Sequence, residues 1–158
     1  STWLVGEHGQ NFAKTILRLA CMRSALRVVA DQWGVPTPTP FLSTQLETLI
    51  KTKPSISKGL YHLVPEGETN WYRYACYIIE KASQHPRWQD RLRIKATSVE
   101  PIPTQAYPLP APRPLNSRLD CHRWRQALGV THLAPFETVL DPVLDRILVQ
   151  EPLDPSEH

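Results

Sequence analysis

Glycine is scarce in this sequence, and long apolar runs are absent from it. Only 6 of the 158 residues are glycine, and they form neither the G-x-G-x-x-G nor the G-x-x-G-x-x-G turn that seats a dinucleotide pyrophosphate. The sequence therefore predicts no nicotinamide-binding site of its own. No apolar run approaches the ~18 residues of a membrane-spanning helix, and the first residues show no signal-peptide pattern, so a soluble protein without membrane contact is predicted.

Residues that form disulfides or bind metals are few and scattered. Cys21, Cys76 and Cys121 lie far apart and form no C-x-x-C pair, which argues against a disulfide framework or a zinc knuckle. The 6 histidines show no H-E-x-x-H arrangement, so no metal site is predicted. Reduced thiols fit a cytoplasmic protein best.

The charge balance gives little support to nucleic-acid binding. The net charge is +3, and the 18 Lys and Arg residues are scattered among 15 acidic residues, so no nucleic-acid partner is predicted. The length favours a single domain over residues 1–158. Residues 151–158 contain two prolines and three acids, and they are expected to fray.

Helix and strand patterns alternate in the first part of the chain. The apolar spacing predicts a helix from Phe12, with Asn11 as its N-cap, because the Asn side chain can accept an orphan amide hydrogen. A Val- and Leu-rich stretch at residues 26–30 predicts a strand, and the turn formers at residues 31–36 predict a loop. This order favours a mixed α/β fold.

A second helix is predicted from Thr39, which can cap it with Pro40 at the first helical position. Its inner face is expected to hold Leu42, Leu46, Leu49 and Ile50. Glu47 and Lys51 are expected to form an i,i+4 ion pair.

The middle of the chain predicts a second buried strand at residues 60–64, followed by a turn and a third helix. Pro86 is expected to end this helix. The inner face of the helix is predicted to hold Trp71, Ala75, Ile78, Ile79 and Ala82.

Proline dominates the segment that follows. The chain has 16 prolines, and their concentration in residues 101–114 predicts extended backbone rather than regular helix or central strand. Asp120 can cap a short helix that Gly129 ends, and a last helix is predicted over residues 136–148. Pro142 is expected to kink or restart that last helix.

Tyr77 and Lys81 match the Y-x-x-x-K spacing by which short-chain dehydrogenases place an acid and a pKa-lowering lysine on one helical face. Such chemistry also needs a nicotinamide site, and the sequence has no motif for one. A structural role on the helix is therefore favoured, and no catalytic residue is predicted.

Several blocks of the sequence, in one collinear order, resemble the dTDP-4-dehydrorhamnose reductases, a branch of the extended short-chain dehydrogenases. The blocks are Ser1-Thr2-Trp3, residues 9–20, residues 31–37, Gly59-Leu60-Tyr61-His62-Leu63, Gly67-Glu68-Thr69-Asn70-Trp71-Tyr72, Pro101-Ile102-Pro103-Thr104, Ala106-Tyr107-Pro108 and Arg113-Pro114-Leu115-Asn116-Ser117-Arg118-Leu119-Asp120.

The resemblance implies an α/β fold, namely the C-terminal sugar-nucleotide-binding part of an extended short-chain dehydrogenase in the NAD(P)-binding Rossmann-like superfamily, without the N-terminal Rossmann core. Members of the family reduce dTDP-6-deoxy-L-lyxo-4-hexulose to dTDP-L-rhamnose with NADPH or NADH, a step in polysaccharide biosynthesis. Their catalytic Thr and Tyr-x-x-x-Lys lie upstream of the block at Trp3. The chain is therefore expected to bind a dTDP-sugar, to hold no cofactor, and to be inactive alone.

Six residues are implied as substrate-binding by their match to the family: Trp3, Asn11, Phe12, Gln32, Arg113 and Asn116. The resemblance implies that Trp3 offers a ring face to the deoxysugar, whereas the sequence alone favours an indole that plugs the core. Asn11 would place a helix N-terminus near the diphosphate, and Arg113 would make a charge-assisted phosphate contact.

The sequence also departs from the family pattern. Pro112 stands where the family usually has the first arginine of Arg-Arg-Pro, and Phe136 stands where it often has tryptophan. Some members bridge a dimer through magnesium held by a glutamate, and this chain has Pro40 at that register. No metal is therefore predicted.

A second hypothesis is a non-catalytic interaction subunit, because the methionine adenosyltransferase regulatory β subunit shares the fold and a related Arg-Pro-x-Asn block. Another nucleotide-sugar reductase or epimerase also stays open. The expected partners are a dTDP-sugar and the N-terminal Rossmann half, which would cover an apolar patch on this chain; self-association through that patch is the alternative.

Overall fold

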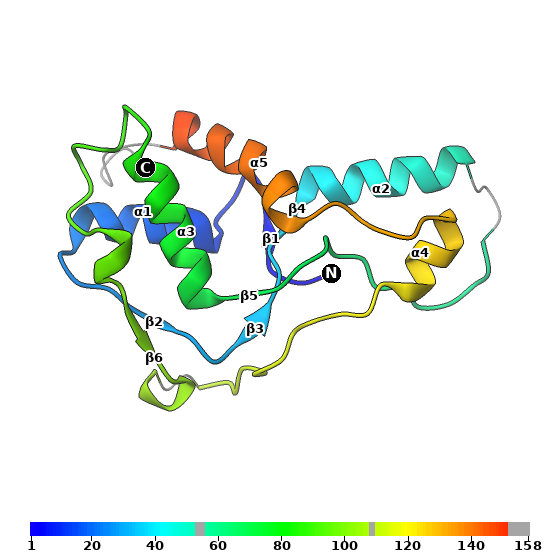
Figure 1. Cartoon of the computed structure of the whole chain (residues 1–158), viewed down its shortest axis with the longest axis horizontal. Coiled ribbons are helices and arrows are strands. Elements are labelled where there is room, and N and C mark those ends of the chain that lie inside the picture. The colour runs from blue at the N-terminus through cyan, green and yellow to red at the C-terminus, as the bar shows by residue number, and fades with distance from the viewer. Residues whose placement is uncertain (53–55, 108–109, 152–158) are drawn as a thin grey trace.

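The computed structural model describes residues 1–52, 56–107 and 110–151, in which short strands alternate with helices (Figure 1). The strands are β1 (Leu4–Val5), β2 (Arg27–Val29), β3 (Trp33–Gly34), β4 (Thr37–Pro38), β5 (Thr69–Asn70) and β6 (Glu100–Ile102). The helices are α1 (Phe12–Met22), α2 (Thr39–Thr52), α3 (Trp71–Ser83), α4 (His122–Leu128) and α5 (Phe136–Gln150), with 3₁₀ turns η1 (Ala96–Ser98) and η2 (Thr104–Ala106).

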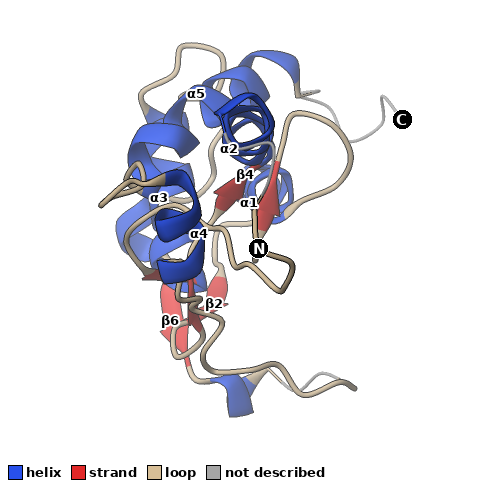
Figure 2. Ribbon diagram, turned by 90° about the vertical axis from the view of Figure 1, so that its right-hand side faces the viewer, coloured by secondary structure: helices blue, strands red, loops and turns tan. Residues whose placement is uncertain are grey.

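The strands pair in twos. β1 pairs in parallel with β4, β2 pairs in parallel with β6, and β3 pairs antiparallel with β5. Figure 2 shows β2 and β6 together at the lower end of the view, away from α2 and α5. The predicted α/β class is confirmed.

Two asparagine caps start the central helices α1 and α3. The Asn11 side chain accepts a hydrogen bond from the Lys14 amide, and the Asn70 side chain accepts one from the Arg73 amide. Each cap satisfies an amide that the first helical turn leaves without a partner. The predicted start of α1 at Phe12 is confirmed.

The apolar faces of α1, α3 and α5 form most of the core. These faces bury Ala13, Ile16, Leu17, Ala20, Tyr74, Ala75, Ile78, Ile79, Ala82, Leu140, Val143, Leu144, Ile147 and Leu148. The indole of Trp88 is 2% exposed and donates its Nε1 hydrogen to the carbonyl of Leu148 at 2.7 Å, which ties the loop after α3 to the end of α5. Apart from Trp71, which is half-buried, the predicted inner face of α3 is buried.

The prediction for the inner face of α2 is confirmed for two of its four residues. Leu42 and Leu49 are partly buried against the core, and Phe41 is fully buried. The prediction was wrong for Leu46 and Ile50, which are 48% and 72% exposed. The i,i+4 ion pair of Glu47 with Lys51 is confirmed.

The strand predicted at residues 60–64 is absent. Leu60 is 70% exposed, and only Leu63 and Val64 are buried, in an irregular segment. Glu66 makes the backbone contacts here, since its amide donates to Ala134 and its carbonyl accepts from Phe136. The apolar run at residues 60–64 therefore reflects the burial of Leu63 and Val64 and not a strand. The predicted loop at 31–36, conversely, contains the short strand β3.

The C-terminal predictions hold with small shifts. Cys121 rather than Asp120 is the N-cap residue of α4, although the Asp120 carboxylate accepts the His122 amide at 2.8 Å. Gly129 ends α4 with a φ of 73°, which suits glycine. α5 does not restart at Pro142 but continues through it.

The proline segment contains no α-helix among its described residues, as predicted; it includes the end of strand β6 and the 3₁₀ turn η2. Pro108 lies outside the described residues, and so do residues 152–158 of the predicted fraying tail. Glu151, just before them, pairs with Lys14 at 3.0 Å. Among the described residues, no helix has the length and apolar character needed to span a membrane.

Candidate functional site

An aromatic cluster of Trp3, Phe12, Trp71 and Tyr74 joins the N-terminal segment to α1 and α3. The indoles of Trp3 and Trp71 are stacked, with centroids 3.7 Å apart and 20° between their planes. Phe12 lies 4.5 Å from Trp71 and 5.3 Å from Tyr74, measured between ring centroids. The rings of Trp3, Phe12 and Trp71 are half-buried, so the cluster has a solvent-facing part.

Trp3 is held in an unusual backbone conformation. Its φ is 45°, and it is the only non-glycine residue with positive φ among those described. Such a conformation is costly for a bulky side chain and persists where surrounding contacts impose it. The contacts are the Trp71 ring and the backbone of Gly34, where a Cβ atom would lie 2.7 Å from Trp3 Cε2. Trp3 therefore packs within the fold and also keeps an accessible part.

Asn11 uses both ends of its side-chain amide for structure. Its Nδ2 donates to the Gly6 carbonyl at 2.9 Å, and its Oδ1 accepts from the Lys14 amide at 3.1 Å. The side chain thereby fixes residues 6–11 against the start of α1. Any ligand at this helix end would meet backbone groups as well as this amide.

Gln32 is buried at one end of the β2–β6 pair. It is 7% exposed, and its Nε2 donates to Thr104 Oγ1 at 3.1 Å. The same Thr104 hydroxyl donates to Asp31 Oδ1 at 2.6 Å, and the Thr104 amide lies 3.0 Å from both carboxylate oxygens. These hydrogen bonds, the hydroxyl's first, lower the pKa of the Asp31 carboxyl below its usual value.

Asn116 lies beside β3, on the far side of Trp33 from β5. The Trp33 amide donates to the Leu115 carbonyl at 2.9 Å, and the Ser117 amide donates to the Trp33 carbonyl at 2.8 Å. Asn116 Oδ1 accepts from the backbone and the side chain of Arg118. The Asn116 side chain is exposed.

Arg113 lies in the exposed segment that leads into this pairing. The structure thus brings Trp3 and Phe12 into one aromatic cluster through Trp71, and pairs Asn116 with Trp33, the residue that follows Gln32. It shows no contact of Arg113 with the other five within the described residues.

Sequence reasoning missed several residues that surround these positions. The Arg73 guanidinium lies 5.1 Å from the centroid of the Trp33 ring, Trp71 stacks on Trp3, and Thr104 links Asp31 with Gln32. A signal existed for the first two, because Asn70 is a recognisable cap that places Trp71 and Arg73 in the first turn of α3. The partners of Trp71 lie far away in the sequence and gave no signal.

Tyr77 and Lys81 are engaged in packing α3 against α5. The Tyr77 hydroxyl donates to Asp141, while Lys81 Nζ lies 3.3 Å from Asp141 and 3.2 Å from Asp145. Burial raises the pKa of Tyr77 above its usual value, and the hydrogen bond to Asp141 and nearby carboxylates add to the effect. A tyrosine in this state is a poor proton donor to a substrate. The structural role favoured by the sequence fits these contacts.

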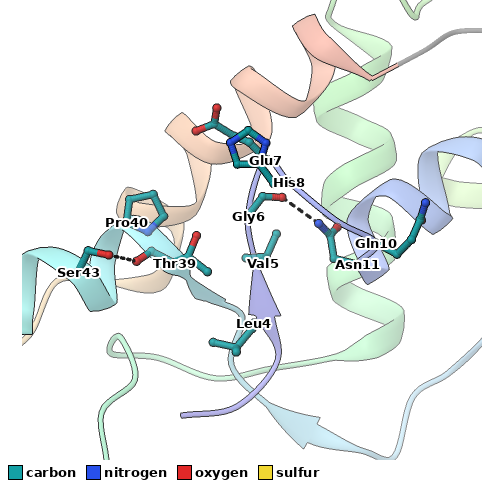
Figure 3. Close-up of a pocket in the computed structure, with 10 residues that line it drawn as sticks. All are labelled: Leu4, Val5, Gly6, Glu7, His8, Gln10, Asn11, Thr39, Pro40 and Ser43. Atoms are coloured by element: carbon teal, nitrogen blue, oxygen red, sulfur yellow. Dashed lines mark hydrogen bonds between the residues drawn. The ribbon is translucent and has the colours of Figure 1, made fainter.

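The hollow shown in Figure 3 lies where β1, α1 and α2 meet. It has a volume of about 430 Å³, and of the six predicted substrate-binding residues only Asn11 lines it. Glu7 on its rim pairs with Arg146 of α5. The other lining residues are Leu4, Val5, Gly6, His8, Gln10, Thr39, Pro40 and Ser43.

No group of three or more metal-ligating side chains occurs within the described part of the chain. Cys21, Cys76 and Cys121 are free thiols. Burial raises the pKa of all three, which keeps them protonated and poorly reactive.

These features define an α/β unit in which short paired strands lie beside packed helices. The family model of the RmlD substrate binding domain matches residues 1–149, and the chain belongs to that family.

Relatives in sequence and structure agree with this assignment. The chain is 40% identical over 129 residues to the dTDP-4-dehydrorhamnose reductase of Escherichia coli K12, and 34% identical over 134 residues to that of Sinorhizobium fredii. These matches cover 80% and 82% of the chain but 41% and 43% of the relatives. The Bacillus anthracis reductase structure, in complex with NADP, superimposes with a TM-score of 0.74 at 29% identity. The Clostridium acetobutylicum structure gives 0.73 at 28% identity.

The structural matches cover 90% and 91% of the chain and 46% of each of the two solved chains. The chain therefore spans less than half the length of these relatives.

Proposed function

We propose that this chain is the sugar-nucleotide-binding part of an NADPH- or NADH-dependent dTDP-4-dehydrorhamnose reductase, which reduces dTDP-6-deoxy-L-lyxo-4-hexulose to dTDP-L-rhamnose. The observation that carries the proposal is the 40% identity with the E. coli reductase over 129 residues. In this proposal the catalytic and cofactor-binding residues lie in the part of the enzyme that corresponds to the unmatched length of the relatives. We place the protein in the cytoplasm, which suits its free thiols.

Two of the six candidate residues, Trp3 and Arg113, have surroundings that support sugar-nucleotide binding. Trp3 keeps a half-buried ring supported from behind by Trp71, which suits contact with the apolar face of a deoxysugar. Arg113 is exposed and stands between two prolines, so little entropy is lost when its guanidinium holds a phosphate. In this proposal the chain binds and orients the sugar nucleotide and performs no hydride transfer.

The binding part of the proposal is tested by calorimetric titration of the chain with dTDP and with dTDP-L-rhamnose. We expect Arg113→Ala to weaken binding of both ligands, while Arg91→Ala, which removes an exposed arginine elsewhere, leaves it unchanged. Trp3→Phe should weaken dTDP-L-rhamnose more than dTDP, because only the former carries the sugar. Equal affinity in all variants would contradict the assigned site.

The catalytic part is tested by incubating the chain with NADPH and the 4-keto sugar nucleotide. We expect no NADPH oxidation. Clear turnover by the purified chain would overturn the proposal that this chain binds the sugar nucleotide but performs no hydride transfer. Absence of nucleotide binding, together with stoichiometric capture of an enzyme, would instead favour the interaction-subunit hypothesis.

A further inference from the structure

The segment of residues 6–11 leads from β1 into α1, and most of its residues line the hollow of Figure 3. Its tip, residues 8–10, is exposed. Gly9 in this tip has a φ of 70°, and a Cβ atom added there would meet nothing within 4 Å. Ordering such a backbone costs conformational entropy, so contacts from elsewhere in the fold must hold the segment in place.

The contacts that hold this segment come from the end of α5. Arg146 donates its Nε hydrogen to Glu7 Oε1, and Gln150 Nε2 donates to Glu7 Oε2 at 3.3 Å, so both carboxylate oxygens are engaged. Glu151, which follows the helix, pairs with Lys14 in the first turn of α1 at 3.0 Å. The end of α5 therefore holds the segment on both sides of its exposed tip.

The end of α5 is itself fixed in the core. Ile147 is 1% and Leu148 2% exposed, and the Leu148 carbonyl accepts the indole hydrogen of Trp88. The Glu7 side chain is only 22% exposed. A single exposed ion pair contributes little to stability, but a mostly buried carboxylate with two donors forms a small network that keeps its geometry.

The held segment determines where Asn11 lies. Asn11 Nδ2 donates to the carbonyl of Gly6, the residue before Glu7, and Asn11 Oδ1 accepts from the Lys14 amide. Each end of the Asn11 amide thus contacts either a residue that α5 holds or the direct neighbour of one. A change in the contact of Glu7 with Arg146 should therefore reach Asn11 through the backbone of Gly6.

We propose that Glu7 and Arg146 are positioning residues for sugar-nucleotide binding, which hold residues 6–11, and with them Asn11, in the conformation that receives the ligand. Neither residue contacts the ligand itself. A wall that is ordered before binding lowers the entropy lost on binding, so loosening it weakens affinity without removing a ligand contact. This inference rests on the proposed function, because it assumes that Asn11 contacts the sugar nucleotide.

Calorimetric titration with dTDP measures the effect on affinity. We expect Arg146→Gln and Glu7→Gln each to weaken binding about three- to tenfold, and the double variant to bind no worse than either, because both act through one contact. Arg146→Lys keeps a charge that can pair with Glu7 and should recover most of the affinity. The control Lys51→Gln breaks an exposed ion pair with Glu47 on α2 and should leave the affinity unchanged.

Hydrogen exchange of the ligand-free chain separates positioning from general destabilisation. The amides of Lys14 and Thr15 donate to the side chain and to the carbonyl of Asn11. In Arg146→Gln these amides should exchange about three- to tenfold faster, because the segment that carries Asn11 opens more often. The amides of Ile78 and Ile79, in the core helix α3, should exchange as in the wild type.

Three results would overturn the inference. If the wild type binds dTDP and both single variants bind it equally well, the contact does not position the site, and the proposed function stands. If exchange rises equally in α1 and α3, the contact stabilises the whole domain and not this segment, and the proposed function again stands. If the wild type itself binds no dTDP, the proposed function fails and the inference fails with it.

Discussion

The indole of Trp3 lies on the indole of Trp71, with 3.7 Å between ring centroids, although the two residues lie far apart in the sequence. Trp71 is the first residue of α3, directly after its cap Asn70, while Trp3 directly precedes β1. The stack therefore couples the position of a candidate sugar-binding ring to the start of a core helix.

Replacing Trp71 with leucine should loosen Trp3 and weaken sugar binding indirectly. The variant keeps an apolar side chain at the start of α3 but removes the ring stack, which contributes about 0.5–1.5 kcal/mol beyond buried area. Far-ultraviolet circular dichroism should lose the exciton couplet expected of two stacked indoles. Calorimetry should then show weaker binding of dTDP-L-rhamnose with little change for dTDP.

The matched control is Trp33→Leu, which removes an indole from β3 rather than from the stack. It should leave the couplet in place. A couplet of equal strength in Trp71→Leu and the wild type would argue against the stack in solution.

Gly34→Ala should destabilise the fold through Trp3. A Cβ atom at this position would lie 2.7 Å from Cε2 and 2.8 Å from Cζ2 of the Trp3 ring, so the ring must shift. Overpacking of this kind costs about 1–3 kcal/mol in the free energy of unfolding. Urea unfolding of Gly34→Ala and of the wild type measures this loss in the free energy of unfolding.

A double-mutant cycle identifies the cause of that loss. In the Trp3→Leu background the smaller side chain leaves room, and Gly34→Ala should cost much less. An unchanged cost in that background would show that the strain lies in the β3 backbone rather than in the ring contact.

Helices α1 and α3 could be predicted from the sequence because local information specifies them. Each begins at an asparagine cap and carries buried apolar residues at helical spacing. The end of α4 at Gly129 followed from the same kind of local rule, since glycine accepts its φ of 73°.

The errors occurred where contacts distant in sequence decide the outcome. The apolar residues at 60–64 had no strand to pair with, and Leu46 and Ile50 of α2 had no covering element among the described residues. At the candidate site, Asn11 and Trp3 were recognisable, but the partners that position Trp3, namely Trp71 and Gly34, depend on tertiary folding.

Tyr77→Phe is expected to affect stability and not ligand binding. The change removes the hydroxyl that donates to Asp141 and leaves Asp141 with Lys81. Loss of one hydrogen bond to a charged group should lower the free energy of unfolding by about 1.5–3 kcal/mol. The affinity for dTDP should stay unchanged. If Tyr77→Phe kept normal stability but lost nucleotide binding or reductase activity, Tyr77 and Lys81 would have to be considered active-site residues.

Asp31→Asn should remove an acid-dependent part of the stability. Because the hydroxyl and amide of Thr104 lower the pKa of Asp31 in the folded chain, this carboxylate stabilises the fold above its unfolded pKa of about 3.9. That stabilisation is lost as the pH falls through the lower folded pKa. The wild type should therefore lose stability below about pH 4 more steeply than Asp31→Asn, and the two should differ most at neutral pH. Urea unfolding between about pH 2.5 and 7 measures both, with Asp90→Asn as the control for losing an exposed carboxylate. Parallel pH profiles for wild type and Asp31→Asn would mean that the Thr104 contacts do not favour the ionised form in solution.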